Sequence, residues 1–486
     1  MKKVRKLLCV FGIIFALFSG EVLTSMASGI QKTYINPIIN EGADPWVVQA
    51  GGAYYYCGSD GDRSIYITKS DNLEDFQSGV RTLVFQTKKG TECGAEVWAP
   101  ELHYVWGNWY IYFAADNGNN DNHRMYVARG GTNKDNPLDG SYSLIGKITD
   151  STDRWAIDGT VLESNDQLYF IWSGWEGAVN VKQNIYIASM SNPWTISGNR
   201  VCISTPDCSW EQNGTPWVNE GPQVLKKGNA VHIIYSASGS WTNEYCLGRL
   251  TCTNGNFLDA ASWVKTGPVF SQANGVYGPG HASFVKSKDG MQDYIVYHAA
   301  KSNGSGWDRN IRTQMFTWHG DVPFFGEPIS AGVELAVPSN GNYAPVTNNR
   351  VYTIVNVETG KCLDVPSGKD ENSLQIQTWD QNGATAQQWK MVCDSDGYFN
   401  IIPMCAPSRA LDNPAASTSD GVIMQLWSQN GHDAQKWRAE YLGDGKYRLI
   451  NKASLKALED NGTKVIQDDI SNDENQLWYL KVNFDT

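Results

Sequence analysis

The sequence is poor in several features that would place it in common protein classes. After residue 27 no apolar run reaches membrane-spanning length, so no later helical membrane span is expected. Basic residues are outnumbered, with 39 Lys and Arg against 51 Asp and Glu, and the formal charge of −12 argues against nucleic acid and anionic membranes as partners. The ten cysteines lack metal-ligand spacing, although Cys202/Cys208 and Cys246/Cys252 could close small disulfide loops.

The one long apolar stretch lies at the N-terminus. Four basic residues within the first six positions precede an apolar region over residues 7–18, and Ser25-Met26-Ala27 offers small residues for cleavage. This order is typical of a secretory signal peptide. We predict that residues 1–27 are removed, which leaves a net charge of −15, and that the mature protein is secreted and extracellular.

Length and composition favour two domains built from strands. A chain of 486 residues is too long for one ordinary core. It contains 19 Trp, 23 Tyr and 47 Gly, which suggests short strands, tight turns and sugar-stacking surfaces, although packing in a β-core explains most of the aromatic residues.

A repeat of about sixty residues runs from residue 34 to 330. Each unit opens with a short strand that carries polar residues and continues with a hairpin of alternating aromatic residues. The opening motifs are GADPWV, WAPELHYV, AIDGTVL, NEGPQVL and GPGHASFV. Their markers Asp44, Glu101, Asp158, Glu220 and His281 are 57, 57, 62 and 61 residues apart. This period predicts an all-β, five-bladed β-propeller over residues 28–335, whose opening motifs converge on one central pit.

A shorter repeat follows a segment without periodicity, which we interpret as a linker over residues 336–350. Three units end in Gln-x-Trp, and the tryptophans Trp389, Trp437 and Trp478 are 48 and 41 residues apart. Three such units predict a β-trefoil over residues 351–486. We expect these tryptophans to lie in its core.

Together the opening motifs resemble glycoside hydrolase family 43. The matching stretches NPIINEGADPWV, EVWAPELHY, AIDGTVL, WVNEGPQVL and GPGHASFV occur in the family's order, and DRNIRTQMFTWHGDVPFFGEP resembles its last blade. The C-terminal 136 residues resemble the ricin-type trefoil, which bacterial enzymes use as a family 13 carbohydrate-binding module. The resemblance implies hydrolysis of a glycosidic bond with inversion at the propeller pit.

The resemblance also implies a role for each of three carboxyl groups. Asp44 would be the general base that activates water, Glu220 the general acid, and Asp158 the residue that raises the acid's pKa and orients it. Inversion needs two carboxyl groups about 6.5–9.5 Å apart, and blades on different sides of a channel can supply that gap. The acid must stay protonated, which burial or a neighbouring carboxylate achieves.

Six further residues are candidates for binding substrate. By family analogy Arg309 and Arg312 bond sugar hydroxyls, with surface salt bridges as the alternative, and Trp98 stacks on a sugar, with blade packing as the alternative. Trp175 and Gln183 are further candidates. His281 would reach the axis and bind substrate or hold a structural calcium ion or water there. No cofactor is required for the chemistry.

The trefoil carries a separate sugar-binding pattern, an aspartate followed by a Gln-x-Trp platform. The first two units keep it, in Asp364, Gln377 and Trp379 and in Asp412, Gln425 and Trp427. The third has Glu459 and, after Gln467, Asp468 and Asp469, so it lacks the aromatic platform. We expect two weak sugar sites; the alternative is a trefoil that serves only as a spacer.

Several functions fit these residues. We predict an exo-acting α-L-arabinofuranosidase that releases arabinose from arabinoxylan or arabinan, because the stretch from SGWEG to VNEGP looks most like that branch. We expect it to act as a monomer. A β-xylosidase, or an enzyme with both activities, would use the same carboxyl groups. An exo-β-1,3-galactanase ranks lower because the relatives considered lack the ADPW-type base. The intact carboxyl groups count against a non-catalytic polysaccharide-binding protein.

Overall fold

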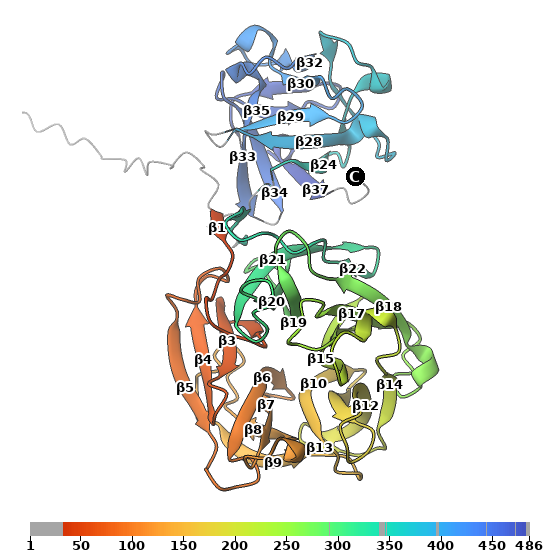
Figure 1. The fold of residues 1–486 in the computed structure, drawn as a ribbon. Helices are drawn as coiled ribbons and strands as arrows, with labels where there is room; N and C mark the ends of the chain where they lie inside the picture. The colour runs from red at the N-terminus through yellow and green to blue at the C-terminus, as the bar shows by residue number, and fades with distance from the viewer. Residues whose placement is uncertain are drawn as a thin grey trace, which may run out of the picture.

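The structure is a computed structural model, and two β-domains follow one another in it (Figure 1). It describes residues 33–290, 292–339, 346, 348–394, 398–443, 445–471 and 473–482. The predicted signal peptide lies outside the described residues, as does part of the predicted linker. No helix in the described part of the chain is long and apolar enough to span a membrane.

Antiparallel sheets are arranged as a ring in the N-terminal domain (Figure 1). The first sheet contains β2 (Trp46–Ala50), β3 (Ala53–Ser59), β4 (Ser64–Ser70) and β5 (Val80–Gln86). The second contains β6 (Ala95–Val105), β7 (Asn108–Asp116), β8 (Arg124–Arg129) and β9 (Ser143–Ile148). The last contains β19 (Tyr277–Lys286), β20 (Asp293–Ala300), β21 (Arg309–His319) and β22 (Val322–Phe324).

Between them lies a nine-stranded sheet made of two antiparallel parts. The first part contains β10 (Ala156–Ser164), β11 (Gln167–Trp175), β12 (Lys182–Asn192), β13 (Thr195–Ile196) and β14 (Val201–Ser204). The second contains β15 (Trp217–Lys227), β16 (Ala230–Ala237), β17 (Cys246–Cys252) and β18 (Val264–Phe270). A short parallel pairing of β12 with β15, at Lys182↔Trp217 and Gln183↔Val218, joins the two parts. The all-β, propeller-like architecture is therefore confirmed, and the count of five separate blades stays a prediction.

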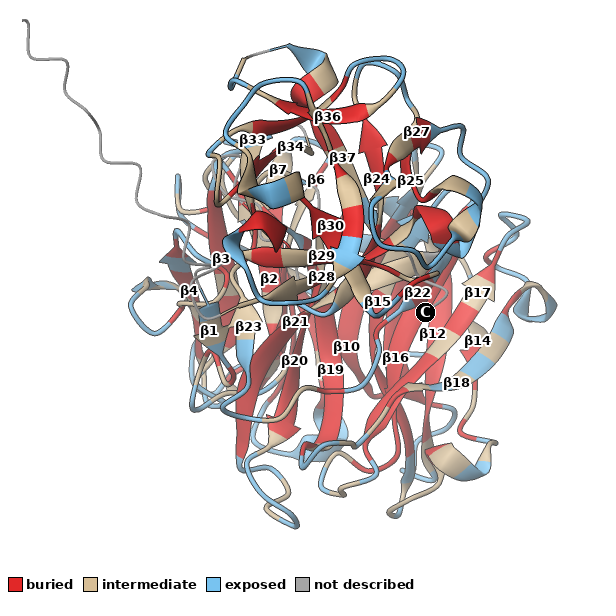
Figure 2. Cartoon of the chain, turned by 90° about the horizontal axis from the view of Figure 1, so that it is seen from above, coloured by how far each residue is buried: buried red, intermediate tan, exposed pale blue. Residues whose placement is uncertain are grey.

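Apolar side chains from neighbouring sheets share one core. Tyr55 and Ile67 of the first sheet pack in one cluster with Leu102 and Phe113 of the second. Burying each such side chain contributes roughly 1.5–3 kcal/mol to stability. The strands β10, β16, β19 and β20 are mostly buried, whereas β14 and β18 are more exposed (Figure 2).

The N-terminal segment is attached to the last sheet and to the end of the domain. β1 (Thr33–Ile35) pairs with β23 (Glu334–Ala336), and Ile38 donates its N–H to the carbonyl of Ile311 at 2.9 Å. The Asn36 side chain bonds both backbone groups of Thr313, at 2.8 and 2.9 Å. Residues nearly 300 positions apart therefore close the ring of sheets.

A six-stranded barrel forms the core of the C-terminal domain. It closes in the order β24 (Arg350–Asn356), β28 (Gln388–Cys393), β29 (Phe399–Pro403), β33 (Lys436–Gly443), β34 (Lys446–Asn451) and β37 (Trp478–Val482), with β37 paired back to β24. Shorter strands lie outside it: β25 (Cys362–Asp364), β26 (Leu374–Gln375), β27 (Gln377–Trp379), β30 (Arg409–Asp412), β31 (Val422–Ile423), β32 (Gln425–Ser428), β35 (Ala457–Asp460) and β36 (Val465–Asp468).

The three Gln-x-Trp tryptophans are fully buried, as predicted. Their indole N–H groups donate to the carbonyls of Leu363, Leu411 and Leu458 at 2.9, 3.1 and 2.9 Å. One hydrogen bond is thus repeated three times, because the indole N–H needs a partner once the ring is buried. The predicted trefoil is confirmed.

Helical structure is confined to single 3₁₀ turns in the described residues. They are η1 (Asn120–Asn122), η2 (Ser209–Glu211), η3 (Ala260–Ser262), η4 (Pro366–Gly368), η5 (Thr385–Gln387), η6 (Pro414–Ala416), η7 (Asp433–Gln435) and η8 (Glu474–Gln476). The nine cysteines described are all free thiols, so the small disulfide loops do not form. Cys246 and Cys252 stand at opposite ends of β17, about 20 Å apart at the strand rise, which is too far for a disulfide.

Candidate active site

One backbone device recurs where the inner strands meet the centre of the ring. Asp44, Ala99, Asp158, Gly221 and His281 all have positive φ, of 50°, 40°, 54°, 55° and 47°. In the last four, this residue and its successor face a single residue of the next strand, which is a β-bulge. The bulge turns the inner strand and directs side chains of different sheets into one pit.

These bulges correct the alignment of the sequence markers. The residues equivalent to Asp44, Asp158 and His281 are Ala99 and Gly221, not Glu101 and Glu220. Glu101 is buried and accepts hydrogen bonds from His103, at 2.8 Å, and from Gln223. Glu220 precedes its bulge by one residue and still reaches the pit. Periodicity could not resolve this shift because the repeats differ in length by a few residues.

A cavity of about 970 Å³ opens at the centre of the ring. It brings together most of the site residues predicted for this domain: Asp44, Trp98, Asp158, Gln183, Glu220, His281 and Arg309. Two others lie outside its wall. Trp175 is buried beneath Trp155, with ring planes 9° apart and centroids 4.8 Å apart, and Trp155 lines the cavity. Arg312 is buried in β21 and donates to the carbonyl of Ile329 at 2.8 Å.

Asp44 lies between two histidines and an arginine. Its Oδ1 is 3.1 Å from Nδ1 of His281, 3.3 Å from Nδ1 of His298 and 3.7 Å from Nη1 of Arg309. Burial alone would raise the pKa of Asp44, but the charge on His281 and its hydrogen bond outweigh it and hold this pKa well below its usual range. Asp44 is therefore ionised, as a general base must be.

Asp158 and Glu220 have the opposite character. Burial raises both pKa values, that of Asp158 to about 8, and the charge on Glu220 adds to the rise at Asp158. At Glu220 the charge of Asp44 adds to burial, whereas His281 and a hydrogen bond from Tyr245 oppose it. Asp158 accepts the N–H of Gly221 at 3.0 Å, which connects the two inner strands. The cavity thus contains one ionised carboxylate and two carboxyl groups whose pKa values are raised.

His281 is the cation at the centre of these acids. Burial would lower its pKa, but Asp44, Asp158 and Glu220 together raise it to about 10. Its backbone N–H donates to the hydroxyl of Ser236 at 2.7 Å, which anchors the bulge. Among the described residues, the groups whose donor atoms converge as metal ligands lie elsewhere and do not include His281, so the calcium prediction stays a prediction.

Two residues beside the acids carry no signal in the sequence. The Tyr245 hydroxyl donates to Oε1 of Glu220 at 2.8 Å, and its ring stacks on His298 with centroids 5.5 Å apart. His298 accepts the N–H of Asp44 at 3.1 Å, and burial lowers its pKa to about 3, so it is neutral. His298 stands in β20 and Tyr245 directly precedes β17, in hairpins where polar residues commonly face solvent. Only the ring of sheets shows that they face the pit.

Aromatic rings surround the cavity mouth. Trp98 is half-buried and stacks on His123, with centroids 3.9 Å apart. Trp241 and Trp307 are 38% and 68% exposed, meet edge to face and also line the cavity. Sugars stack on exposed aromatic faces, so these tryptophans add to the predicted platform, which sequence motifs placed at Trp98 alone.

The remaining predicted residues have partners in the protein. Arg309 donates to the carbonyl of Ser240 at 2.6 Å and lies near Asp44, so it is held at the cavity wall. Gln183 accepts a hydrogen bond from Ser173 at 3.3 Å and is 9% exposed.

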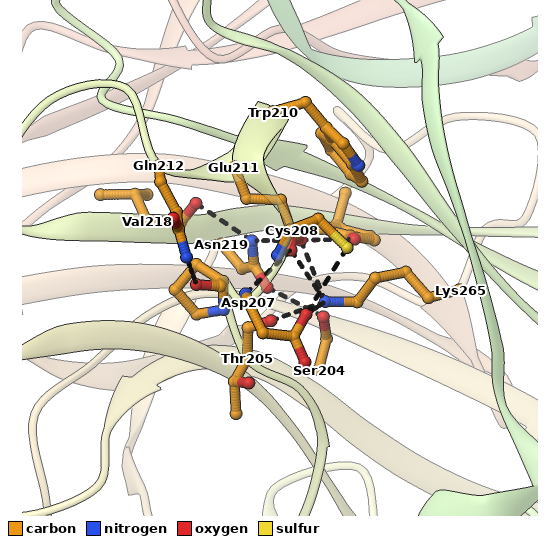
Figure 3. A network of polar contacts seen from close by, with 12 residues as sticks. Ser204, Thr205, Asp207, Cys208, Trp210, Glu211, Gln212, Val218, Asn219 and Lys265 are labelled. Atoms are coloured by element: carbon orange, nitrogen blue, oxygen red, sulfur yellow. Dashed lines mark hydrogen bonds and ion pairs between the residues drawn. The ribbon is translucent and has the colours of Figure 1, made fainter.

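A buried polar network supports the strand of Glu220 (Figure 3). Glu211 is fully buried and accepts hydrogen bonds from Asn219 at 3.0 Å, from Tyr235 at 2.8 Å and from Lys265 at 2.9 Å. Asn219 in turn accepts from Ser204 at 2.8 Å and directly precedes Glu220. A buried charge with this many donors is satisfied, and the backbone next to Glu220 is held in place.

The trefoil repeats one polar pair in its first two units. Gln377 donates to Asp364, and Gln425 to Asp412, both at 2.8 Å. Trp379 and Trp427 remain 56% and 37% exposed beside them. In the third unit the residue opposite Glu459 is Ile466, so Gln467 is not the equivalent of the two glutamines. That unit therefore lacks the glutamine as well as the aromatic ring.

Comparison with known proteins agrees with this architecture. The model of the family described as glycosyl hydrolases family 43 matches residues 34–323. The chain belongs to this family. It is thus a glycoside hydrolase, and residues 342–427 and 404–467 match the ricin-type β-trefoil lectin domain-like family.

Curated relatives of this family 43 hydrolase carry arabinofuranosidase names. An extracellular exo-alpha-(1->5)-L-arabinofuranosidase of Streptomyces avermitilis is 37% identical, over 64% of this chain and 67% of the relative. Alpha-L-arabinofuranosidase 43 of Humicola insolens is 36% identical, over 66% and 69%. The crystal structure of an alpha-L-arabinofuranosidase from Lactobacillus brevis superposes with a TM-score of 0.57 at 34% identity, over 62% of this chain and 98% of that one.

Proposed function

We propose that this family 43 hydrolase is an exo-acting α-L-arabinofuranosidase that releases arabinose, with inversion, from arabinoxylan or arabinan. The observation that carries the proposal is the unequal ionisation of the three carboxyl groups in one cavity. Asp44 is held ionised by a lowered pKa, whereas the pKa values of Asp158 and Glu220 are raised. A base and an acid at pH values near neutral are what a single displacement by water requires.

Each carboxyl group has a role in this proposal. Asp44 removes a proton from the attacking water and is the most exposed of the three, with 28% of its side chain accessible. Glu220 protonates the leaving oxygen. Asp158 shares the buried region with Glu220 and, through the N–H of Gly221, holds the backbone beside it. Arg309 and the tryptophans at the mouth bind the sugar.

The substrate follows from the relatives and the trefoil. Relatives at 32–37% identity are named arabinofuranosidases, and two of the names specify exo action on α-1,5-linked arabinose. The lectin-like domain supports a polymeric plant cell-wall substrate. The extracellular names of two relatives agree with export by the predicted signal peptide.

The deciding assay compares aryl α-L-arabinofuranoside with aryl β-D-xyloside and follows the released sugar by NMR. We expect hydrolysis of the arabinofuranoside with the anomeric configuration inverted. Cleavage of the xyloside alone would establish the β-xylosidase instead, comparable cleavage of both would establish the bifunctional enzyme, and retained configuration would refute the mechanism.

Replacement of the acid tests its role separately. We expect Glu220→Ala to lose roughly 10²–10⁴-fold in kcat on natural linkages, the usual contribution of general acid catalysis. The loss should be much smaller on aryl glycosides whose leaving group needs no proton. Glu41→Gln, an exposed carboxyl at the cavity rim, is the matched control and should behave like the wild type. Equal losses on both substrate types would remove Glu220 from the acid role.

A further inference from the structure

A second group of potential ligand atoms lies behind the aromatic wall of the cavity. Glu96 of β6, Asp116 at the end of β7 and His123 after η1 place one carboxylate or imidazole atom each within 4.8 Å of the others. Asp116 and His123 are fully buried, and Glu96 is half-buried. None of the three belongs to the site described above.

His123 is surrounded by hydrogen-bond acceptors. Its Nε2 lies 3.1 Å from the carbonyl oxygen of Glu96, and its Nδ1 lies 3.4 Å from Oδ2 of Asp116. A neutral imidazole has one N–H. If Nε2 donates to Glu96, the lone pair of Nδ1 faces a carboxylate oxygen. The carbonyl of Asn120, 3.3 Å from Nδ1, does not need that proton, because it already accepts from Trp155 at 2.8 Å and from the N–H of His123 at 3.1 Å.

Asp116 has a buried oxygen without a donor. Its Oδ1 accepts the N–H of Gly118 at 2.8 Å, whereas Oδ2 has no hydrogen-bond partner among the described residues. Arg124, next to His123, does not serve it. That guanidinium donates to Asp153 at 2.9 Å and to the carbonyl of His123 at 2.8 Å. A buried carboxylate oxygen directed at a lone pair is unfavourable unless a cation lies between them or a proton on Glu96 or His123 satisfies it.

We propose that a divalent cation binds here, held by the carboxylates of Glu96 and Asp116 and by Nδ1 of His123, with water completing the shell. Neighbouring ligands of a tetrahedral ion with bonds of about 2.0–2.1 Å are about 3.3–3.4 Å apart. The separation of Nδ1 and Oδ2, 3.4 Å, matches that spacing. One imidazole with carboxylates suits Zn²⁺ or Mn²⁺ better than Mg²⁺ or Ca²⁺. Because Glu96 is only half-buried, the ion can reach the site from solvent on that side.

The site has a structural consequence for the cavity. The ring of His123 stacks on Trp98, and the turn at Asn120 is bonded to Trp155. Trp98, Asn120 and Trp155 all line the cavity. A bound cation would fix the ring of His123 and thereby brace this wall without touching the three catalytic carboxyl groups.

The second acidic cluster in the described residues is neutralised by a lysine of the protein itself. Asp207, Cys208 and Glu211 also converge, but Nζ of Lys265 lies 2.6 Å from Asp207 and 2.9 Å from Glu211 (Figure 3). A lysine supplies the positive charge there. No lysine or arginine is paired with Glu96 or Asp116 in the described residues, so the two groups differ in what neutralises them.

The test is metal binding by the full chain without a histidine tag, after treatment with a chelator. We expect titration calorimetry to show one Zn²⁺ per chain and the melting temperature to rise with Zn²⁺. Asp116→Asn and Glu96→Gln, which keep the side-chain shape, should each weaken binding at least about tenfold and abolish the thermal shift. Asp121→Asn, an exposed acid in the adjacent turn, should bind like the wild type.

The variant Asp44→Asn distinguishes a failure of the metal site from a failure of the proposed hydrolase activity. It should bind Zn²⁺ like the wild type whether or not the chain hydrolyses arabinofuranosides. Absence of binding with both Zn²⁺ and Mn²⁺ would overturn the proposal, and so would full binding by both Asp116→Asn and Glu96→Gln. In the first case a proton on Glu96 or His123 would satisfy Asp116 in place of a cation.

Discussion

His281 balances the charges of the proposed active site at the scale of single residues. It contacts Asp44 directly, and it is the positive charge that all three carboxyl groups share. The carboxyl group that bonds the imidazolium is ionised, and burial raises the pKa values of the two that are more deeply buried. Burial and one histidine thus separate the base from the acid within one cavity.

Tyr245 should set the upper pH limit of activity. Its hydrogen bond to Glu220 lowers that residue's pKa, because the ionised form accepts it. Removal of the hydroxyl in Tyr245→Phe should therefore raise the pKa of Glu220. We expect the alkaline limb of kcat/KM against pH to move to higher pH. The free energy of unfolding should also fall by about 1–3 kcal/mol, because a buried hydrogen bond is lost. A limb that moves to lower pH would contradict this assignment.

Asp158 should make the protein less stable as pH rises. Its pKa is about 8 in the folded chain against 3.8 ordinarily, so between these values the folded form holds a proton that the unfolded form has lost. Stability attributable to this group is highest below pH 3.8 and falls up to pH 8. His281, raised from 6.5 to about 10, adds a loss over that higher window.

Asp158→Asn removes the first of these dependences. We expect its melting temperature relative to the wild type to be higher at pH 7.5 than at pH 4.5. Each kcal/mol of difference in the free energy of unfolding corresponds to roughly 2–4 °C, or less in a chain of this length. Catalysis should be lost at both pH values. Asp308→Asn, an exposed acid at the rim, is the control. An equal difference at both pH values would mean that Asp158 is ionised in the folded protein.

The bulge is the feature that matters at the scale of elements. Positive φ in a residue other than glycine costs about 1–3 kcal/mol, and aspartate and histidine are among the residue types found there more often. Asp44, Asp158 and His281 therefore combine chemistry with a tolerated backbone conformation. In the strand β15 the acid is Glu220, one residue before the bulge, and Gly221 adopts the positive φ.

Gly221 should not tolerate a side chain. A Cβ there would lie 3.1 Å from Cγ and 3.2 Å from Nδ1 of His281, and φ of +55° adds strain. We expect Gly221→Ala to destabilise the protein by about 1–3 kcal/mol and to reduce activity by displacing His281. Gly320→Ala is a control for backbone strain alone, because its φ is +58°, a Cβ there would meet nothing within 4 Å, and it does not line the cavity. Similar activity in the two variants would refute the role given to the contact.

The trefoil should act on binding rather than on chemistry at the scale of the whole molecule. Trp379 and Trp427 are exposed beside the two polar pairs, and neither lines the catalytic cavity. We expect the double change Trp379→Ala and Trp427→Ala in the full chain to leave kcat/KM on aryl arabinofuranoside unchanged. Retention on insoluble arabinoxylan should fall at least about tenfold, given about 1–3 kcal/mol for each exposed aromatic anchor.

The third unit supplies the matched control for that experiment. Asp468 stands where the aromatic ring is missing, so Asp468→Ala should bind the polysaccharide like the wild type. Unchanged retention by the double variant would favour a trefoil that is only a spacer. A fall in activity on the small substrate would instead mean that the trefoil supports the catalytic domain.

The sequence by itself determined the two repeats and the strand-rich architecture, whereas the three carboxyl groups of the cavity were singled out by the family resemblance, because the repeat alone also marked Glu101. The repeats and the architecture follow from local pattern: alternation of side chains along a strand, and motifs that recur at a near-constant interval. The tryptophans of the trefoil core were predictable for the same reason, since one residue type recurs at one place in each unit.

Only the tertiary structure decided the partners and the charges. His298 reaches Asp44 across 254 residues, Tyr245 reaches Glu220 from another hairpin, and Trp155 rather than Trp175 faces the cavity. A one-residue shift at a bulge reverses the face on which a side chain lies, and repeats of unequal length do not reveal it. The pKa of a carboxyl group depends on burial and on charges brought together by closure of the ring, so no local pattern could determine which acid keeps its proton.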